Sequence, residues 1–254
     1  MFDELRGKSV LITGASTGIG AAVARGFGRY GASVGVHCHR SADAAEEVAA
    51  TVRDAGGAAA VLQGDVTDKT DVGRIIDAHV QEFGLLDVLI NNAGDVVRRS
   101  AFEQLDDELI DHVIALNARA VVTACRLALP HFLRQGRGNI INTTSLAARQ
   151  AGGPGSSVYS ACKGFAQSLT RFLAREYAPR NIRVNAVAPG LIMTPLQDRN
   201  TTPAQLELMK RAIPMGRPGQ PEDCVGAYLF LATDALSGFI TGATIDVNGG
   251  AYMG

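Results

Sequence analysis

The sequence predicts one α/β domain built on a parallel β-sheet that helices cover on both faces. Short runs rich in β-branched residues alternate with longer amphipathic stretches along the chain, a pattern typical of strands joined by crossover helices. Hydrophobic residues make up 46% of the 254 residues and aromatic residues 6%, with 29 glycines and no tryptophan, which suits helices packed closely on a sheet. The sequence has no linker-like, repeated or low-complexity segment, so we expect a single domain over residues 1–254.

The expected strands are short runs in which Val, Ile, Leu and Ala predominate. Such runs match the length of strands that are buried on both faces of a parallel sheet. In chain order they are Ser9–Ile12, Ser33–His37, Ala59–Leu62, Asp87–Ile90, Asn139–Asn142, Arg183–Val187 and Thr244–Val247.

Helical stretches lie between these strands. A helix between successive strands makes a right-handed crossover, which keeps the strands parallel and places helices on both faces. The expected helices are Gly18–Arg29, Ala42–Asp54, Asp71–Phe83, a long one from Asp106 to about Leu133, and one from about Val158 to Tyr177.

The segment from Gly190 to Pro221 interrupts this alternation. It contains five prolines and only a short helical pattern near Pro203 to Arg211. Because a loop this long in a compact domain usually carries function, we expect a substrate loop at about residues 190–221. An ordered surface excursion is the alternative.

Charge and composition exclude several classes of partner. The 24 basic and 25 acidic residues leave a net charge of −1 without a basic stripe, so we expect no nucleic-acid partner. The first residues are too polar for a signal peptide, and no apolar run reaches the roughly 18 residues of a membrane span. We therefore expect a cytoplasmic protein that binds no membrane.

Cysteine and histidine positions indicate neither disulfides nor a metal site. The four cysteines are far apart and form no C-x-x-C pair, which fits a reduced compartment. The five histidines have no ligand spacing, so we expect no metal. His79 and His112 fall within helical stretches, and we expect both at the surface.

A glycine-rich turn follows the first expected strand. It reads Thr13-Gly14-Ala15-Ser16-Thr17-Gly18-Ile19-Gly20, with the spacing G-x-x-x-G-x-G. Glycines let the backbone approach a pyrophosphate without a Cβ in the way. The helix that starts near Gly18 points its free N–H groups and positive dipole end at the same place. The turn therefore predicts a dinucleotide phosphate site.

Four further motifs follow in order: Asp65-Val66 after the third strand, Asn91-Asn92-Ala93-Gly94 after the fourth, Tyr159-Ser160-Ala161-Cys162-Lys163 on a helix, and Pro189-Gly190. Together with the glycine turn they resemble the motifs of the short-chain dehydrogenase/reductase family. The resemblance extends over nearly the whole chain. It implies a doubly wound, Rossmann-type sheet of seven parallel strands in the order 3-2-1-4-5-6-7, with a dinucleotide across their carboxyl ends.

The same resemblance implies a set of cofactor-binding residues. The pyrophosphate end would be held within the glycine turn, the adenine after the third strand, its ribose after the fourth, and the nicotinamide carboxamide just past Pro189-Gly190. Lys163, beside Tyr159, would reach the nicotinamide ribose hydroxyls. Position by position, these residues are Gly14, Ser16, Thr17, Gly18, Ile19, Gly20, Asp65, Val66, Asn91, Ala93, Gly94, Tyr159, Lys163, Pro189, Gly190, Ile192 and Thr194.

Tyr159 and Lys163 lie four residues apart, hence on one face of the expected helix. A free tyrosine, with a pKa near 10, is a poor base at neutral pH, and bringing it to about 7 takes roughly 4 kcal/mol of phenolate stabilisation. The Lys163 ammonium and an oxidised nicotinamide are positive charges suited to supply it. We expect an oxidoreductase that moves a hydride between NAD(P)(H) and a carbonyl or alcohol, with Tyr159 as acid/base.

Two more catalytic candidates follow from the resemblance. Ser145, at the end of the fifth strand, would hydrogen-bond the substrate oxygen. Thr144 is the competing hydroxyl, but the spacing to the tyrosine motif favours Ser145. Asn117 matches the family's helix asparagine, which would kink the helix and hold a water linked to Lys163. An ordinary buried amide is the alternative for Asn117.

The end of the second strand indicates which cofactor is preferred. NAD-specific relatives place an aspartate there, whereas this chain has His39, Arg40 and Ser41 and no acid before Asp43. Arg40 presents a planar charged fork that suits a phosphate. Against this, Thr17 stands where many NADP-preferring relatives carry a basic residue. NADP(H) is therefore favoured and NAD(H) remains open, with a solvent-facing Arg40 as the alternative.

Substrate and assembly are less defined. Residues 146–158 would line the substrate cleft, where Arg149 is a candidate for an anionic group and Gln150 for hydroxyls. The chain looks closest to the 3-oxoacyl-carrier-protein reductase and sugar dehydrogenase branches, and a catalytically silent NAD(P)-binding regulator or scaffold is the other class. Relatives pair the helix from Val158 to Tyr177 and the apolar C-terminal region across two-fold axes, which implies a homotetramer.

Overall fold

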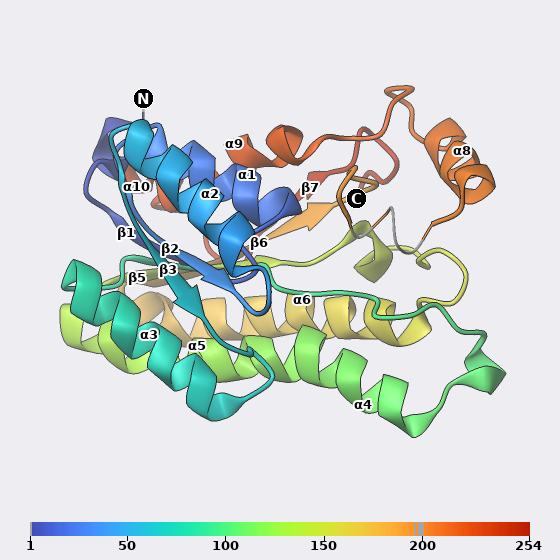
Figure 1. The fold of residues 1–254 in the computed structure, drawn as a ribbon, viewed down its shortest axis with the longest axis horizontal. Coiled ribbons are helices and arrows are strands. Elements are labelled where there is room, and N and C mark those ends of the chain that lie inside the picture. Colours follow the sequence, from blue (N-terminus) through green and yellow to red (C-terminus); the bar gives the residue numbers. More distant parts are fainter. Residues whose placement is uncertain (1, 196, 198–200) are drawn as a thin grey trace.

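The computed structural model describes residues 2–195, 197 and 201–254. Its centre is a parallel sheet of seven strands in the order β3-β2-β1-β4-β5-β6-β7 (Figure 1). The fold class predicted from the sequence, a single Rossmann-type domain, is confirmed. The strands are β1 Ser9–Ile12, β2 Ser33–Cys38, β3 Ala58–Gln63, β4 Val88–Asn91, β5 Gly138–Thr143, β6 Ile182–Pro189 and β7 Thr244–Val247.

Helices form a layer on each side of the sheet (Figure 1). Helices α1, α2 and α9 pack together on one face, and α3, α5 and α6 cover the other. Their bounds are α1 Gly18–Gly28, α2 Ala42–Asp54, α3 Lys69–Phe83, α4 Asp107–Ile114, α5 Ala120–Gln135, α6 Ser157–Tyr177, α8 Pro203–Arg211, α9 Pro221–Ala232 and α10 Asp234–Ser237. Single turns lie at Asp3–Leu5, Phe102–Gln104, Leu146–Ala148 and Ala178–Arg180.

Strand residues divide the core into two halves. On β1, Val10 and Ile12 belong to the cluster under α1, α2 and α9, while Leu11 belongs to the cluster under α3, α5 and α6. This alternation follows from the two-residue period of a strand. Both faces of the sheet are covered, so all four residues of β1 and of β4 are buried. The apolar runs in the sequence therefore mark strands buried on both faces.

The long helical region expected from Asp106 to about Leu133 is one continuous helix from Asp107 to Gln135, with a π-helical segment at Ala115–Arg119. Its length and its mean hydropathy of 1.4 would allow a membrane span, but half of the apolar window is buried inside the domain. Ala124, Ala128 and Phe132 pack in the core beneath the sheet. We therefore interpret it as a core helix of the domain.

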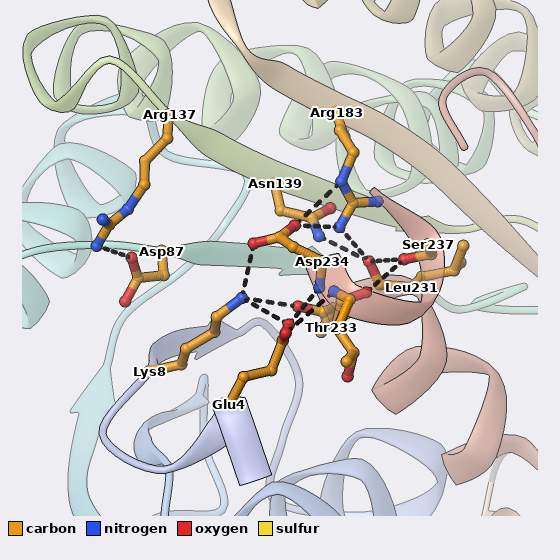
Figure 2. Close-up of polar contacts among 12 residues, drawn as sticks. Glu4, Lys8, Asp87, Arg137, Asn139, Arg183, Leu231, Thr233, Asp234 and Ser237 are labelled. Carbon is orange, nitrogen blue, oxygen red and sulfur yellow. Dashed lines mark hydrogen bonds and ion pairs between the residues drawn. The ribbon is translucent and has the colours of Figure 1, made fainter. Parts of the chain in front are cut away.

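A polar network joins α9 and α10 to the amino ends of three strands (Figure 2). Arg183 on β6 donates to the carbonyl of Leu231 at 2.7 Å and to Asp234 Oδ1 at 2.9 Å. Lys8, just before β1, donates to Asp234 Oδ2 at 2.9 Å. Glu4 accepts the backbone N–H groups of Asp234 and Ala235. The network thus satisfies the end of α9 and the start of α10, where backbone groups lack helical partners.

His79 on α3 is fully buried, so the expectation that it lies at the surface is wrong, whereas His112 is exposed as expected. His79 Nε2 lies 2.6 Å from Ser9 Oγ. The ring fits because β2 has a glycine opposite it: a Cβ at Gly35 would lie 2.4 Å from His79 Nδ1. Burial lowers the pKa of His79 to about 3, because a charged imidazolium in the core would lack the water that stabilises it in solution.

We predict that His79 makes the protein sensitive to acid. The folded pKa lies below the unfolded value of 6.5, so the unfolded chain binds a proton that the folded chain does not. The neutral ring's contribution is complete above pH 6.5 and is lost as the pH falls toward 3. Between pH 7 and pH 5 this amounts to about 2 kcal/mol. His79→Gln should lose about that much less over the same interval in urea unfolding.

His112→Gln, the same substitution at an exposed histidine, is the matched control and should lose as much stability as the parent chain. Equal losses in the parent and in His79→Gln would contradict the prediction.

Candidate active site

A cleft of about 910 Å³ opens at the carboxyl ends of the strands. It is bounded by the turns after β1 to β6 and by the segment that follows Pro189. Three of the residues predicted for the site, Gly20, Asn91 and Asn117, do not line it. The predicted residues that do are Gly14, Ser16, Thr17, Gly18, Ile19, His39, Arg40, Ser41, Asp65, Val66, Ala93, Gly94, Ser145, Tyr159, Lys163, Pro189, Gly190, Ile192 and Thr194.

The glycine turn has a backbone that only glycine adopts easily. Gly14 and Gly18 have φ angles of +64° and +55°, in the left-handed region. Helix α1 starts at Gly18, so its first N–H groups face the cleft. Gly20 packs the turn against itself, because a Cβ there would lie 2.3 Å from the carbonyl oxygen of Gly14. The turn can therefore accept a negatively charged group at close range.

Hydrogen bonds fasten this turn to the loop after β4. The Thr13 hydroxyl accepts the N–H groups of Asn92 and Ala93 at 2.9 and 3.0 Å. The Asn92 amide donates to the carbonyls of Thr13 and Gly14, both at 3.0 Å. The sequence motifs predicted no separate role for the side chains of Thr13 and Asn92. Their signal was only that polar residues follow two strands that become neighbours.

The side chain of Asn91 points away from the cleft. Its amide nitrogen donates to Asn142 Oδ1 at 2.8 Å, and the Asn142 amide donates to the Thr170 hydroxyl at 2.9 Å. This buried chain connects β4, β5 and α6. Any contact of Asn91 with a ribose would thus come from its backbone, while its side chain aligns the helix that carries Tyr159.

Ser145 and Tyr159 are brought together from β5 and α6. Ser145 follows β5, and its hydroxyl accepts the N–H of Ala147 at 3.1 Å. Burial raises the pKa of Tyr159 to about 12, and the hydrogen bond with Ser145 acts in the opposite direction. The competing hydroxyl, on Thr144, donates to the Val187 carbonyl at 3.1 Å and is 2% exposed. Ser145 is therefore the hydroxyl that pairs with the tyrosine.

Lys163 lies one helical turn after Tyr159 and is 3% exposed. Its ammonium donates to the Thr143 carbonyl at 2.9 Å and lies 5.5 Å from the centre of the Tyr159 ring. Burial lowers the pKa of Lys163 to about 8, because a charged group is costly to remove from water. A positive charge is thus held behind the tyrosine at neutral pH.

Asn117 lies in the π-helical segment and is fully buried. Its amide nitrogen donates to the carbonyls of Asp95 and Val113 at 2.8 and 2.9 Å, while its Oδ1 has no partner among the described residues. A Cβ at Gly94 would lie 2.7 Å from Asn117 Oδ1 and 3.0 Å from Lys163 Nζ. The amide oxygen and the ammonium therefore face the same point beside Gly94.

The substrate side of the cleft corrects one expectation. Arg149 does not line the cleft; its guanidinium lies 3.5 Å from Asp246 Oδ2 and stacks over the Tyr252 ring. Gln150 lines the cleft as expected, and so does Arg99, for which the sequence predicted no role. Arg149 turns away because β7 and the C-terminal segment offer it a carboxylate and an aromatic face.

The segment after Pro189 contributes the remaining wall. Its cleft-lining residues include Thr194, Met209 and Ile213; positions 196 and 198–200 of the expected substrate loop lie outside the described residues. Among the described residues, no group of three or more His, Cys, Asp or Glu side chains is arranged to hold a metal ion.

Comparison with known proteins identifies the family. A family model described as enoyl-(acyl carrier protein) reductase matches residues 14–252. The chain belongs to the short-chain dehydrogenase/reductase family. Within it, 3beta-hydroxysteroid dehydrogenase 1 of Eggerthella lenta is 40% identical over 255 residues, covering 100% of this chain and 97% of that protein. The 3-oxoacyl-acyl-carrier-protein reductase FabG of Staphylococcus aureus is 39% identical over 246 residues, covering 97% and 98%.

Solved members of the family superpose along the whole chain. The NADH-dependent reductase A1-R' in complex with NAD has a TM-score of 0.89 and 38% identity, with 100% of both chains covered. A short-chain dehydrogenase from Burkholderia cenocepacia in complex with NADP has a TM-score of 0.90 and 33% identity, covering 97% of this chain and 98% of that one. Like these relatives, this member of the short-chain dehydrogenase/reductase family is an oxidoreductase, and a nicotinamide cofactor is supported.

The cleft itself fits such a cofactor on two observations. In the glycine turn, a Cβ at Gly18 would lie 3.1 Å from Thr194 Cγ2, so the glycine keeps a side chain out of the space between the start of α1 and Thr194. At the other end, the buried amide oxygen of Asn117, beside the ammonium of Lys163, accepts no hydrogen bond from the part of the chain that the structure describes. The first suits a phosphate and the second a polar network next to a sugar.

We predict that Gly94→Ala lowers turnover by about 10- to 100-fold, because its methyl group would occupy the point that Asn117 Oδ1 and Lys163 Nζ face and displace the lysine. The measurement is kcat at saturating cofactor and substrate, with thermal unfolding to check the fold. Gly164→Ala is the matched control, since a Cβ there would lie within 4 Å of no described residue outside its own helical turn. Turnover of Gly94→Ala within twofold of Gly164→Ala would show that this point is not used.

Proposed function

We propose that this protein transfers a hydride between NAD(P)(H) and a carbonyl or secondary alcohol, with Tyr159 as the acid/base. The observation that carries the proposal is that Ser145, Tyr159 and Lys163 line one cleft, with the Lys163 ammonium 5.5 Å from the centre of the tyrosine ring. A phenol, a hydroxyl and an ammonium at one point are the groups needed to handle a proton on a carbonyl oxygen.

The residues divide the work as follows. The cofactor, when bound, supplies or accepts the hydride at the substrate carbon. In reduction, the Tyr159 hydroxyl gives its proton to the substrate oxygen and becomes a phenolate, while the Ser145 hydroxyl donates a hydrogen bond to the same oxygen. Lys163 stabilises the phenolate by charge attraction. In oxidation each proton moves the other way.

The shifted pKa values of Tyr159 and Lys163 support Tyr159 as a proton donor in this environment. With its pKa raised to about 12 the phenol is protonated at neutral pH. The ammonium of Lys163, with its pKa lowered to about 8, loses its charge at higher pH. Reduction should therefore proceed steadily below about pH 8 and slow above it, as the phenolate formed by proton donation loses its stabilising charge.

Asn117 would complete the proton path. Its Oδ1 and Lys163 Nζ both lie within 3.0 Å of the position that a Cβ on Gly94 would take, so the two polar atoms are close enough together for one water to bridge them. Such a water would let Lys163 return a proton toward Tyr159 from solvent. This role goes beyond that of an ordinary buried amide, whose oxygen would have a protein partner.

A catalytically silent cofactor binder is the weaker candidate. Binding alone would not require Ser145, Tyr159 and Lys163 in one cleft. It would also not require a buried lysine whose pKa is lowered by its burial. Groups with pKa values perturbed by burial and gathered in a cleft favour chemistry.

The substrate wall supports a carbonyl compound with an apolar body. Val96, Leu146, Met209 and Ile213 line the cleft, while Gln150 provides a polar contact. This supports a 3-oxoacyl thioester more than a sugar or polyol, whose hydroxyls would each need a partner. The 3-oxoacyl reductase and hydroxysteroid dehydrogenase among the relatives are consistent with that preference.

Tyr159→Phe should lose turnover by about 10²- to 10⁴-fold while cofactor affinity stays within a few-fold, because the change removes the phenolic hydroxyl, the acid/base group, and little else. Initial rates over a panel of 3-oxoacyl thioesters, ketosteroids, simple ketones and sugars would first select the best substrate of the parent chain. Tyr177→Phe, at the far end of the same helix, is the matched control and should keep full activity. Comparable rates for the two variants would refute the assignment of Tyr159.

We further propose that NADP(H) is favoured, with NAD(H) also accepted. Arg40 and Ser41 line the cleft next to the end of β2, and both are exposed enough to reach a 2′-phosphate. Asp65 lies 3.8 Å from the third candidate, His39, so its carboxylate weakens the local positive charge. Thr17 adds no second cation. Relatives are known with each cofactor.

Arg40→Ala should lower kcat/KM for NADPH by about tenfold and leave that for NADH nearly unchanged, because one charge-assisted contact to the phosphate is lost. Steady-state kinetics with both cofactors measure this. Arg53→Ala, an exposed arginine on α2 outside the cleft, is the control. A parent chain that prefers NADH tenfold, with no effect of Arg40→Ala, would refute the preference and its cause.

A homotetramer and a cytoplasmic location complete the proposal. Phe165 and Phe172, seven residues apart on α6, are 46% and 66% exposed, so one face of that helix is suited to pack on a second copy. All four cysteines are buried and free, which suits a reduced compartment. Light scattering should return four times the mass of one chain.

A further inference from the structure

His37 connects two parts of the cofactor cleft that the motifs treat separately. It lies near the end of β2, is 2% exposed and lines the cleft. The backbone N–H of Gly14 donates to its Nδ1 at 3.0 Å, and its Nε2 lies 3.0 Å from the carbonyl oxygen of Gly64. The backbone N–H of Ala15 also donates to the His37 carbonyl, at 2.8 Å. Two successive residues of the glycine turn, Gly14 and Ala15, are thus hydrogen-bonded to one residue of β2, His37.

These partners require the neutral ring in one tautomer. Since Gly14 offers an N–H, Nδ1 must accept and carries no proton. Since Gly64 offers only a carbonyl, Nε2 must carry the proton and donate. Burial lowers the pKa of His37 below 6.5, so this neutral form is present at neutral pH. A second proton would place Nδ1–H against the N–H of Gly14, and two donors cannot share that contact.

The charged groups around His37 come from three elements. His39, two residues later, lowers its pKa, while Asp65 after β3 and Asp71 on α3 raise it. Both carboxylates have other partners: Asp65 accepts the N–H and hydroxyl of Thr67, each at 2.8 Å, and Asp71 accepts the N–H of Asp65 at 2.7 Å. Burial outweighs their attraction, so the ring stays neutral although two acids lie near it.

We propose that His37 is a positioning residue for the cofactor, whose neutral ring holds the phosphate-binding turn in register with the adenine end of the cleft by bridging Gly14 and Gly64. The inference rests on the proposed cofactor cleft. Gly14 belongs to the turn that would face the pyrophosphate, and Gly64 immediately precedes Asp65-Val66, which would flank the adenine. Protonation of His37 releases Gly14, so dinucleotide affinity falls with acid.

Two substitutions separate the bridge from the charge. His37→Gln keeps an acceptor and a donor on one short side chain but does not titrate. His37→Leu keeps apolar volume and removes both bonds. The dissociation constant of NAD⁺ is measured by calorimetry, without substrate, from about pH 8 to about pH 5; NAD⁺ is used because the 2′-phosphate of NADP⁺ itself titrates in this range.

At about pH 8 we expect His37→Gln to bind NAD⁺ within about threefold of the parent and His37→Leu to bind it at least about tenfold more weakly, since the N–H of Gly14 loses its acceptor. Toward pH 5 the affinity of the parent should fall several-fold and that of His37→Gln should stay flat. His39→Gln reports how much of any change comes from the exposed histidine nearby.

The outcomes are distinct. A parent chain that binds neither NAD⁺ nor NADP⁺ would overturn the cofactor cleft itself. A parent that binds NAD⁺, with His37→Leu within threefold of it, would overturn the positioning role alone. Affinity of the parent that is constant or rises with acid, or an acid loss that persists in His37→Gln, would overturn it as well. The glutamine profile decides the matter even where His37→Leu fails to fold.

Discussion

Parallel pairing decides which residues can meet in this protein, because it brings the carboxyl ends of the strands to one edge of the sheet. Ile12 of β1 pairs with Ile90 of β4, and Asn91 pairs with Asn142 of β5. The residues that follow these strands are far apart in sequence but adjacent at the edge. Thr13 therefore reaches the loop after β4, about 80 residues away in the sequence. The cleft therefore depends on the parallel alignment of the strands, which brings the separate sequence motifs together.

Burial at this edge changes the chemistry of each ionisable group in the direction of its neutral form. It raises the pKa of Tyr159 and lowers those of Lys163 and His37. The sequence suggested that about 4 kcal/mol of phenolate stabilisation would make tyrosine a base at neutral pH. Burial adds to that requirement, since its effect exceeds that of the Ser145 hydrogen bond. The protein alone therefore holds a phenol suited to donate a proton. A phenolate at Tyr159 needs a positive charge beside it in the cleft, such as the ammonium of Lys163.

Sequence patterns predicted what repeats along the chain and missed what depends on a partner from another element. Continuous apolar runs located all seven strands, because strands buried on both faces leave little polar signal. Helix α9, Pro221–Ala232, was seen only as an apolar stretch, since it is hydrophobic on most sides. His79 was assigned to the surface because its hydroxyl partner, Ser9, lies 70 residues away on another element. The expectation for Arg149 failed for the same reason, because its carboxylate partner, Asp246, lies on β7, far away in the sequence.

The polar contacts at the amino ends of the strands differ in role from those at the carboxyl ends. At the amino edge, Arg183, Lys8 and Asp234 form a network that joins helix ends to strands and takes no part in the cleft (Figure 2). At the carboxyl edge, hydrogen bonds such as that from Gly14 to His37 both hold the fold and shape the site. A polar group there cannot be exchanged freely, because its loss leaves a buried partner unsatisfied as well as moving a binding surface. At the carboxyl ends of the strands, as at the buried His79, the protonation state of a side chain is therefore constrained as well as its size.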